Sequence, residues 1–244
     1  RQSYLKGYQA DALHEFNEAV QSDASDSDKA IALTYMGIIH DEQGKYDKAV
    51  EFYDRAVRYD SANPIIYRNM SLTYRHMRQF DKAVDAVRKA IRLEPRNVNN
   101  RLLAGNILFE QGKYRDARAE YQEVLGIQPE NASALYNLSM TLIRDGDQVS
   151  AIEYLKKAGD ADRIGKVAHM SYSKLGVVFT QMGDYEIAEN YLKKAISINP
   201  TDPLDRYNLG IVNLKKNDKE AALREFAKAE ELGKSDAAML ANLG

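Results

Sequence analysis

A short phrase, Gly-Lys-Tyr-x-x-Ala, returns along this chain at a fixed interval. It occupies residues 44–49 and 112–117, and its two glycines are 68 residues apart, which is twice 34. Gly146 follows Gly112 by another 34 residues. A repeat of this length is too small to bury its own apolar face, so it must stack on its neighbours. The period therefore predicts an array of stacked repeats, although a length of 244 residues alone would suggest one or two domains.

Composition excludes several classes of function. The chain has 34 Lys and Arg against 36 Asp and Glu, so no broad basic field favours nucleic acid. No apolar run approaches the roughly 20 residues of a membrane span, so we expect a soluble protein with no membrane insertion. The absence of cysteine excludes disulfides and thiolate chemistry. It leaves the compartment open, with the cytoplasm slightly favoured over the periplasm.

Small residues recur at three positions when Ala30 is taken as the first residue of a repeat. The eighth position holds Gly37, Ser71, Gly105, Ser139, Gly176 and Gly210. The twentieth holds Ala49, Ala83, Ala117, Ala151, Ala188 and Ala222, and the twenty-seventh holds Ala56, Ala90, Val124, Ala158, Ala195 and Ala229. Small side chains at fixed positions let two helices approach closely. We therefore expect each repeat to contain two closely packed helices.

Turn and breaker residues delimit these helices. The glycine of the recurring phrase suits a helix end that needs positive φ. Pro95, Pro129 and Pro200 follow the second apolar stretch and stop helix propagation there. Asn63-Pro64 and Asp202-Pro203 have the form of a helix start, with a capping residue followed by proline. Each repeat is predicted to be an antiparallel helix hairpin.

Together, the period, the small eighth residue, the Gly-x-Tyr turn, the two alanine positions and the closing proline resemble the tetratricopeptide repeat. The resemblance covers essentially the whole chain, although no repeat has the Trp that the family often carries at the fourth position. It implies an all-α fold, a right-handed superhelical solenoid of helix hairpins. The full repeats are predicted at 30–63, 64–97, 98–131, 132–168, 169–202 and 203–236.

The ends and two long repeats depart from a uniform stack. Residues 1–29 are predicted to hold the tail of one helix and a complete second helix, and 237–244 to begin a further helix, as in a fragment of a longer protein. Two repeats run to 37 residues, with extra polar residues near 24–29 and 160–167. These predict a lengthened surface loop, or alternatively a hinge or change of curvature near residue 160.

No motif of catalysis or metal binding stands out. The four histidines lie at unrelated positions of different repeats, with no carboxylate or histidine partner at metal-ligand spacing, and we expect packing or surface roles for them. No nucleophile with a base, phosphate loop or carboxylate pair is evident. We therefore expect no enzyme activity, no metal and no cofactor.

The resemblance implies that partners bind on the concave face, where family members hold peptides or partner helices. On the first helix of each repeat, positions two, five, six, nine, twelve and thirteen face away from the packing positions. The ninth position holds Ile38, Leu72, Asn106, Met140, Val177 and Ile211. This mostly apolar row predicts a groove for an amphipathic helix or apolar segment. The alternative is an inner layer that neighbouring helices cover.

Amides recur at the sixth position. They are Asn69, Asn137, Asn208 and Asn242, with Tyr136 and Tyr207 before two of them. Because an amide both donates and accepts, such a row can pair with the backbone of an extended peptide. The alternative is hydrogen bonding within the array.

Charged contacts on this face are a weaker prediction. Asn106, Asn137 and Lys174 match positions of the clamp with which some relatives hold a terminal carboxylate. Leu102 and Met170 stand where that clamp has basic residues, which argues against a clamp here. A modestly basic stretch of the groove is formed by Arg68, Arg75, His76 and Arg144, for which a solvated helix face is the alternative.

These observations predict a non-catalytic scaffold or adaptor for protein–protein interaction. Its partner is another protein, as an extended peptide or amphipathic helix. One alternative is a regulatory or substrate-recruiting region of a larger enzyme, and another is a self-assembling structural array.

Overall fold

The computed structural model describes the backbone of residues 2–241 and the side chains of residues 8–234. These residues form thirteen α-helices and no strand, which confirms the predicted all-α fold. The helices are α1 Gln2–Gln21, α2 Asp26–Glu42, α3 Tyr46–Tyr59, α4 Pro64–His76, α5 Phe80–Leu93, α6 Val98–Glu110, α7 Tyr114–Ile127, α8 Ala132–Arg144, α9 Gln148–Asp162, α10 Lys166–Met182, α11 Tyr185–Ile198, α12 Pro203–Lys215 and α13 Lys219–Ala241.

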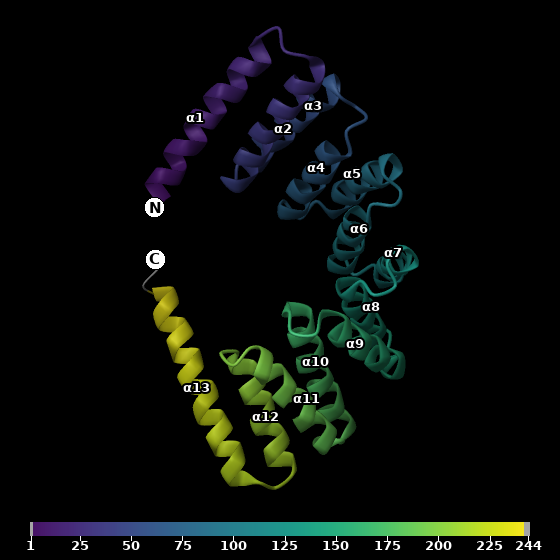
Figure 1. Cartoon of the computed structure of the whole chain (residues 1–244), viewed down its shortest axis with the longest axis vertical. Helices are drawn as coiled ribbons and strands as arrows, with labels where there is room; N and C mark the ends of the chain where they lie inside the picture. Colours follow the sequence, from purple (N-terminus) through teal and green to yellow (C-terminus); the bar gives the residue numbers. More distant parts are fainter. Residues whose placement is uncertain (1, 242–244) are drawn as a thin grey trace. The chain divides into compact units, whose positions relative to one another are not determined.

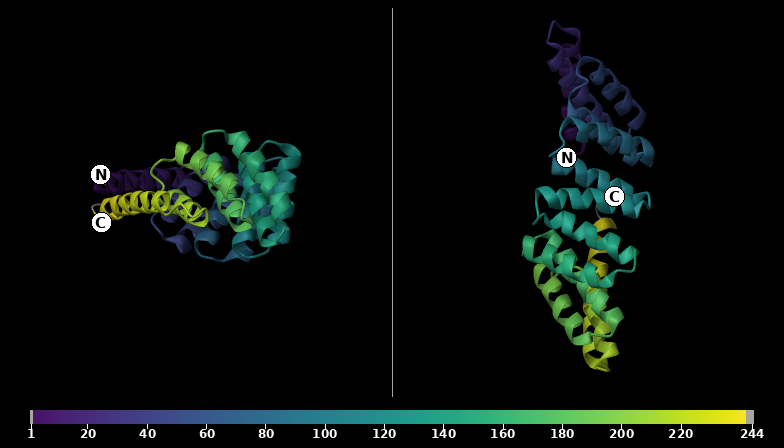
Figure 2. Two further views of the ribbon diagram at one scale, coloured as in Figure 1. Left: turned by 90° about the horizontal axis from the view of Figure 1, so that it is seen from below. Right: turned by 90° about the vertical axis from the view of Figure 1, so that its right-hand side faces the viewer.

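The chain divides into two compact units, Arg1–Glu123 and Val124–Gly244, with the boundary inside α7. In unit 1, α2 packs on α3 and α4 on α5. In unit 2, α8 packs on α9, α10 on α11 and α12 on α13. Figures 1 and 2 show these pairs as antiparallel hairpins. Each repeat thus has a first helix (α2, α4, α6, α8, α10 or α12) and a second helix (α3, α5, α7, α9, α11 or α13).

The predicted packing positions form the cores. Every residue at the twentieth position is fully buried, and those at the twenty-seventh are at most 9% exposed. In unit 1, Tyr53 is 1% exposed and its ring lies against Gly37, where a Cβ would be 2.4 Å from a ring carbon. In unit 2, Leu192 takes the equivalent place against Gly176. The small eighth residue is therefore needed to admit a large side chain from the second helix.

The turn between the two helices is left-handed in all six repeats. Its backbone φ is positive at the fifteenth position, held by Gly44, Gly112, Gly146, Gly183, Arg78 and Asn217. At Gly44 this matches the conformation that glycine adopts without steric cost. At Arg78 the backbone φ is also positive, at 58°, although a residue with a side chain disfavours this conformation.

Replacing Arg78 with glycine is expected to stabilise the protein by about 0.5–1 kcal/mol. The left-handed conformation costs an L-residue about 1–2 kcal/mol, and the extra freedom of glycine in the unfolded chain offsets about 0.5–1 kcal/mol of the gain. Urea unfolding followed by circular dichroism measures the change. Asn217→Gly is the matched control, and its effect should be smaller because asparagine tolerates this conformation. A loss of stability in Arg78→Gly would contradict this explanation.

The extra residues of the two long repeats lengthen helices, not loops. The first helices α2 and α10 have 17 residues, whereas α4, α6, α8 and α12 have 13. The predicted long loop near 160 is reduced to three residues, because α9 continues to Asp162 and α10 begins at Lys166. Neither extra segment contains proline, so helix formation can extend through it.

Both terminal helices also run further than expected. α1 is one helix from Gln2 to Gln21, with no turn separating two helices. α13 continues to Ala241, through the predicted boundary between 236 and 237. No proline interrupts it there, unlike the ends of α5, α7 and α11, which precede Pro95, Pro129 and Pro200. Asn242 lies outside the described residues. Among the helices described, none has the length and apolarity needed to cross a membrane.

Candidate partner-binding surface

All thirteen predicted groove residues lie on first helices, and none is fully buried. Ile38, Arg68, Asn69, Leu72 and Asn106 belong to unit 1, and Tyr136, Asn137, Met140, Lys174, Val177, Tyr207, Asn208 and Ile211 to unit 2. The ninth position is half-buried in every repeat, while the eighth position beside it is buried. The second position is more open, with Ile31, Ile65 and Leu204 exposed by 44%, 50% and 67%. This face is therefore not wholly covered by neighbouring helices.

In unit 1, a pocket of about 400 Å³ opens between α2 and α4. Its walls are Ile31, Thr34, Tyr35 and Ile38 from α2, and Asn63, Ile65, Arg68 and Asn69 from α4 and its cap. The pocket brings together three predicted residues, Ile38, Arg68 and Asn69. Leu72 and Asn106 are not among its lining residues. The walls are mainly apolar and also include one cationic and two amide side chains.

Tyr35 was missed by the sequence prediction. It is 51% exposed, and its ring stacks on Phe16 of α1 with centroids 5.4 Å apart. Tyr35 stands at the sixth position, where Asn69 stands in the next repeat. That shared position is the signal that could identify Tyr35, although its side chain differs from the recurring asparagine.

Two residues of the predicted basic stretch, Arg75 and His76, are paired with carboxylates in unit 1. The guanidinium of Arg75 donates from Nε to both Glu110 oxygens, at 3.0 and 2.9 Å, and from its Nη2 as well. His76 Nδ1 lies 3.1 Å from Asp41 Oδ2, and the other oxygen, Asp41 Oδ1, accepts a hydrogen bond from the Thr73 hydroxyl. These contacts join residues 32 to 35 apart, so they link consecutive repeats. Arg75 and His76 therefore face carboxylates of neighbouring repeats, which reduces the expected cationic character of this surface.

One predicted amide is used inside unit 1. Asn106 Oδ1 accepts a hydrogen bond of 2.9 Å from the hydroxyl of Tyr121 in the second helix of the same repeat. Burial raises the pKa of that hydroxyl, because ionisation would place a charge in the core. This bond supports the alternative of internal pairing at Asn106.

In unit 2, the same face carries exposed apolar side chains on α12. Leu204, Tyr207 and Leu214 are exposed by 67%, 52% and 48%. The Tyr207 ring lies 5.4 Å from that of Phe226 in α13. Tyr136 on α8 is half-buried, and this burial raises the pKa of its hydroxyl. Unit 2 thus also presents an apolar face on its first helices.

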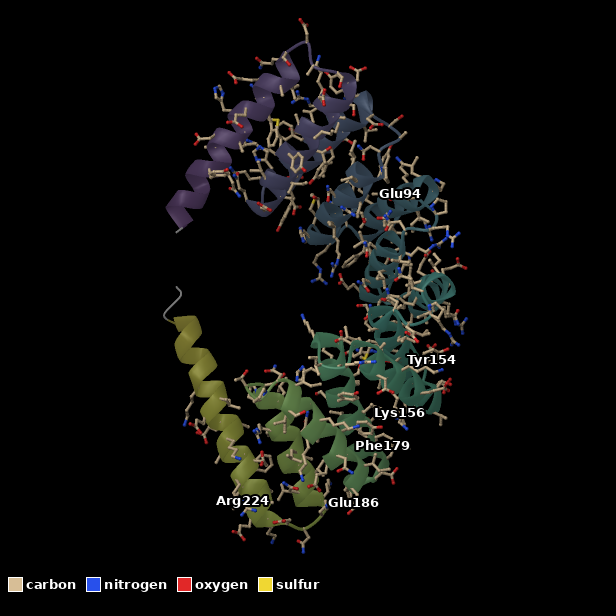
Figure 3. All side chains as sticks on the ribbon, in the orientation of Figure 1. Glu94, Tyr154, Lys156, Phe179, Glu186 and Arg224 are labelled. Carbon is tan, nitrogen blue, oxygen red and sulfur yellow. The ribbon has the colours of Figure 1, made fainter. Side chains whose placement is uncertain are left out.

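The second helices of unit 2 present a different surface. Lys156 of α9 lies 5.9 Å over the ring of Phe179 (Figure 3), and Lys194 lies 5.4 Å from the rings of Tyr172 and Tyr191. A hollow of about 600 Å³ along α11 is lined by Lys193 and Lys194 among six residues of that one helix. Lys194 is engaged with its aromatic neighbours, and Lys193 pairs with Glu189 at 2.6 Å. We therefore place the candidate surface on the first helices.

The histidines differ from expectation. The sequence shows no carboxylate at metal-ligand spacing from His76 or His169, but in the structure each has a carboxylate partner in an adjacent repeat. His14 also lies 3.6 Å from Glu18. His40 packs on Phe52 with ring centroids 5.1 Å apart, and burial lowers its pKa. Contacts between repeats join residues 35 and 36 apart, so no local motif spacing reveals them.

Comparisons with known proteins agree with the repeat architecture. A family model described as tetratricopeptide repeat matches residues 10–64 and 102–163, and another of the same description matches 170–202. A model described as anaphase-promoting complex, cyclosome, subunit 3 matches residues 42–124.

Similar curated proteins are longer than this chain. RNA polymerase II-associated protein 3 of Rattus norvegicus is 28% identical over 189 residues, covering 73% of this chain and 29% of the relative. BBSome complex member BBS4 of Mus musculus is 28% identical over 234 residues, covering 95% of this chain and 43% of the relative. The chain thus spans less than half the length of these relatives.

A solved structure has a similar fold. The crystal structure of MamA has a TM-score of 0.63 and 25% sequence identity, covering 69% of this chain and 97% of MamA. The shared helix hairpins, the buried small positions and the matched family models lead to one assignment. The chain belongs to the tetratricopeptide repeat family.

Proposed function

We propose that this chain is a non-catalytic scaffold that binds an apolar segment of another protein on its first helices. The observation that carries the proposal is the pocket between α2 and α4. Ile31, Tyr35 and Ile65 expose between 44% and 51% of their surface there. Apolar side chains that are exposed together and flanked by polar groups are typical of a protein-binding site.

The partner we favour is an amphipathic helix. Such a helix inserts apolar residues at i, i+3, i+4 and i+7 into a groove of this kind. Arg68 and Asn69 at the pocket edge would then pair with acidic or backbone groups of the partner. An extended peptide held by Asn69, Asn137 and Asn208 is the alternative form of the same proposal.

The names of the relatives support a role in larger assemblies. One is called associated with RNA polymerase II, and another a member of the BBSome complex. We propose that this chain likewise acts by holding a partner within an assembly. Its place as a recruiting region beside an enzyme remains compatible with that role.

The test is selection of helical peptides from a displayed library on the immobilised chain. We expect enriched sequences with apolar residues at helical spacing, and Ile65→Glu should weaken their binding by at least about tenfold, because a carboxylate would be buried against apolar atoms. Ile65 is half exposed, so circular dichroism and the melting temperature should change little.

The matched control is Leu223→Glu, which changes an apolar residue that is 69% exposed on α13. It should bind the selected peptides as the parent chain does. Selected peptides that bind Ile65→Glu and the parent equally well would refute the pocket between α2 and α4 as the site.

A further inference from the structure

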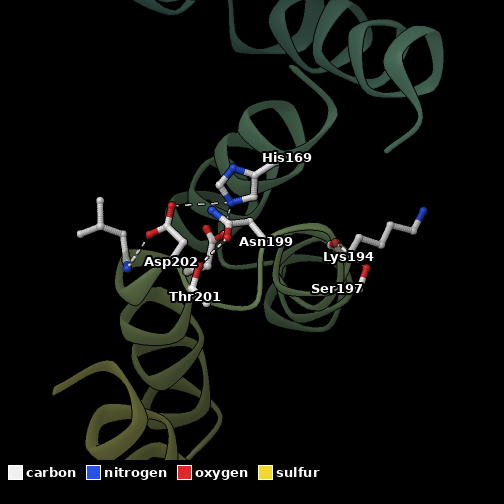
Figure 4. Close-up of polar contacts among 8 residues, drawn as sticks. His169, Lys194, Ser197, Asn199, Thr201 and Asp202 are labelled. Carbon is white, nitrogen blue, oxygen red and sulfur yellow. Dashed lines mark hydrogen bonds and ion pairs between the residues drawn. The ribbon is translucent and has the colours of Figure 1, made fainter. Parts of the chain in front are cut away.

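Three side chains from the N-terminal ends of two helices, α10 and α12, converge in unit 2. His169 lies in the first turn of α10, Asp202 caps α12, and Asp205 lies in the first turn of α12. His169 Nε2 is 2.7 Å from Asp205 Oδ2 and 3.6 Å from Asp202 Oδ2. One ligand atom from each of the three lies within 4.8 Å of the others. Figure 4 shows His169 directed toward Asp202, with a dashed line between the two side chains.

Asp205 is unusual for its position. It is 0% exposed and stands at the third position of its repeat, where the other repeats carry the uncharged residues Ala32, Ile66, Asn100, Ala134 and Ser171. Its Oδ1 is buried and has no hydrogen-bond partner among the described residues. A buried carboxylate is costly unless an opposite charge or a metal compensates it.

The surrounding contacts favour a bound cation. Asp202 Oδ1 accepts a hydrogen bond of 2.9 Å from the backbone N–H of Leu204, which leaves Oδ2 directed toward His169. The His169 and Asp202 side chains remain 12% and 24% exposed, so an ion could enter from solvent. An imidazole with two carboxylates is a donor set suited to zinc and similar divalent transition metals.

We propose that His169, Asp202 and Asp205 bind one divalent transition metal ion of the zinc type. Zinc lies about 2.0–2.2 Å from nitrogen and oxygen ligands, so tetrahedral ligand atoms are about 3.4 Å apart. The distance of 3.6 Å between His169 and Asp202 already fits, and that of 2.7 Å between His169 and Asp205 must open by less than about 1 Å. A water molecule or a partner's side chain completes the shell. The ion ties α10 to α12.

The experiment uses the full 244-residue chain, freed of metal by a chelator. Zn²⁺ is titrated by calorimetry, and Co²⁺ by the visible absorption that reports tetrahedral coordination. We expect one ion per chain and a rise in melting temperature on adding Zn²⁺. His169→Gln should weaken binding by at least about tenfold, since even supporting groups of metal sites contribute tenfold or more.

His76→Gln is the matched control. His76 also faces a carboxylate of the adjacent repeat, Asp41, but among residues 8–234 it belongs to no group of three possible metal ligands. It should leave metal binding unchanged. Asp202→Asn, which keeps a capping oxygen, provides a second variant if His169→Gln folds poorly.

Saturable binding that is lost in both site variants and kept in His76→Gln supports the proposal. Absence of saturable binding, or equal binding by all variants, overturns it and leaves a hydrogen bond between His169 and Asp205 alone.

Discussion

Replacing Tyr53 with alanine should destabilise the protein by about 3–5 kcal/mol, the cost of removing a fully buried aromatic side chain and leaving a cavity. Tyr53 is 1% exposed and belongs to the core of unit 1, with Leu33, Ile66 and Met70. Its ring fills the space left by the missing side chain of Gly37.

Urea unfolding followed by circular dichroism measures this loss. Tyr53→Phe is the control, because it keeps the ring and removes only the hydroxyl, at a cost of about 0.5–1.5 kcal/mol for one hydrogen bond. If alanine and phenylalanine had the same effect, the ring would not carry the packing between the two helices.

Alkaline pH should destabilise unit 1 steeply. Burial raises the pKa of the hydroxyl of Tyr53 and that of Tyr121 above the ordinary value for tyrosine. Above about pH 10 the unfolded chain loses these protons and the folded chain keeps them. Stability is therefore complete below about pH 10 and falls as the pH rises, by about 1.4 kcal/mol per pH unit for each group.

The test compares the chain with its double variant Tyr53→Phe, Tyr121→Phe across pH 9 to 11. The stability difference between them should shrink by about 2.7 kcal/mol per pH unit above about pH 10, because two ionisations are removed together. Other alkaline effects act on both proteins and cancel. A difference that stays constant with pH would show that neither hydroxyl is held protonated by the fold.

The repeat fold was predictable because its determinants recur in the sequence. Six alignments of the same small positions identified Ala49 and its equivalents as core, and the Gly44 turn identified the hairpin. The added turn of α2 and α10 was not predictable from the same signal, because a periodic pattern cannot tell an inserted loop from an inserted helical turn. Only the absence of proline at those places pointed to helix.

The candidate partner-binding surface was predictable only in part. Helical periodicity placed Ile38, Arg68 and Asn69 on one face, but could not show that they line one pocket with Tyr35. It also missed the partners of His76 and His169. Those partners are 35 and 36 residues away, so stacking of consecutive repeats creates contacts that no short motif contains.

The contacts between consecutive repeats make the order of the repeats matter. Asp41 contacts Thr73 and His76, which stand at the tenth and thirteenth positions of the following repeat. If residues 64–97 were deleted, the same positions would bring Ile107 and Glu110 beside Asp41. A hydroxyl and an imidazole would be exchanged for an apolar chain and a second carboxylate. Removing this repeat would thus break the contacts at Asp41, although the repeats share one two-helix organisation.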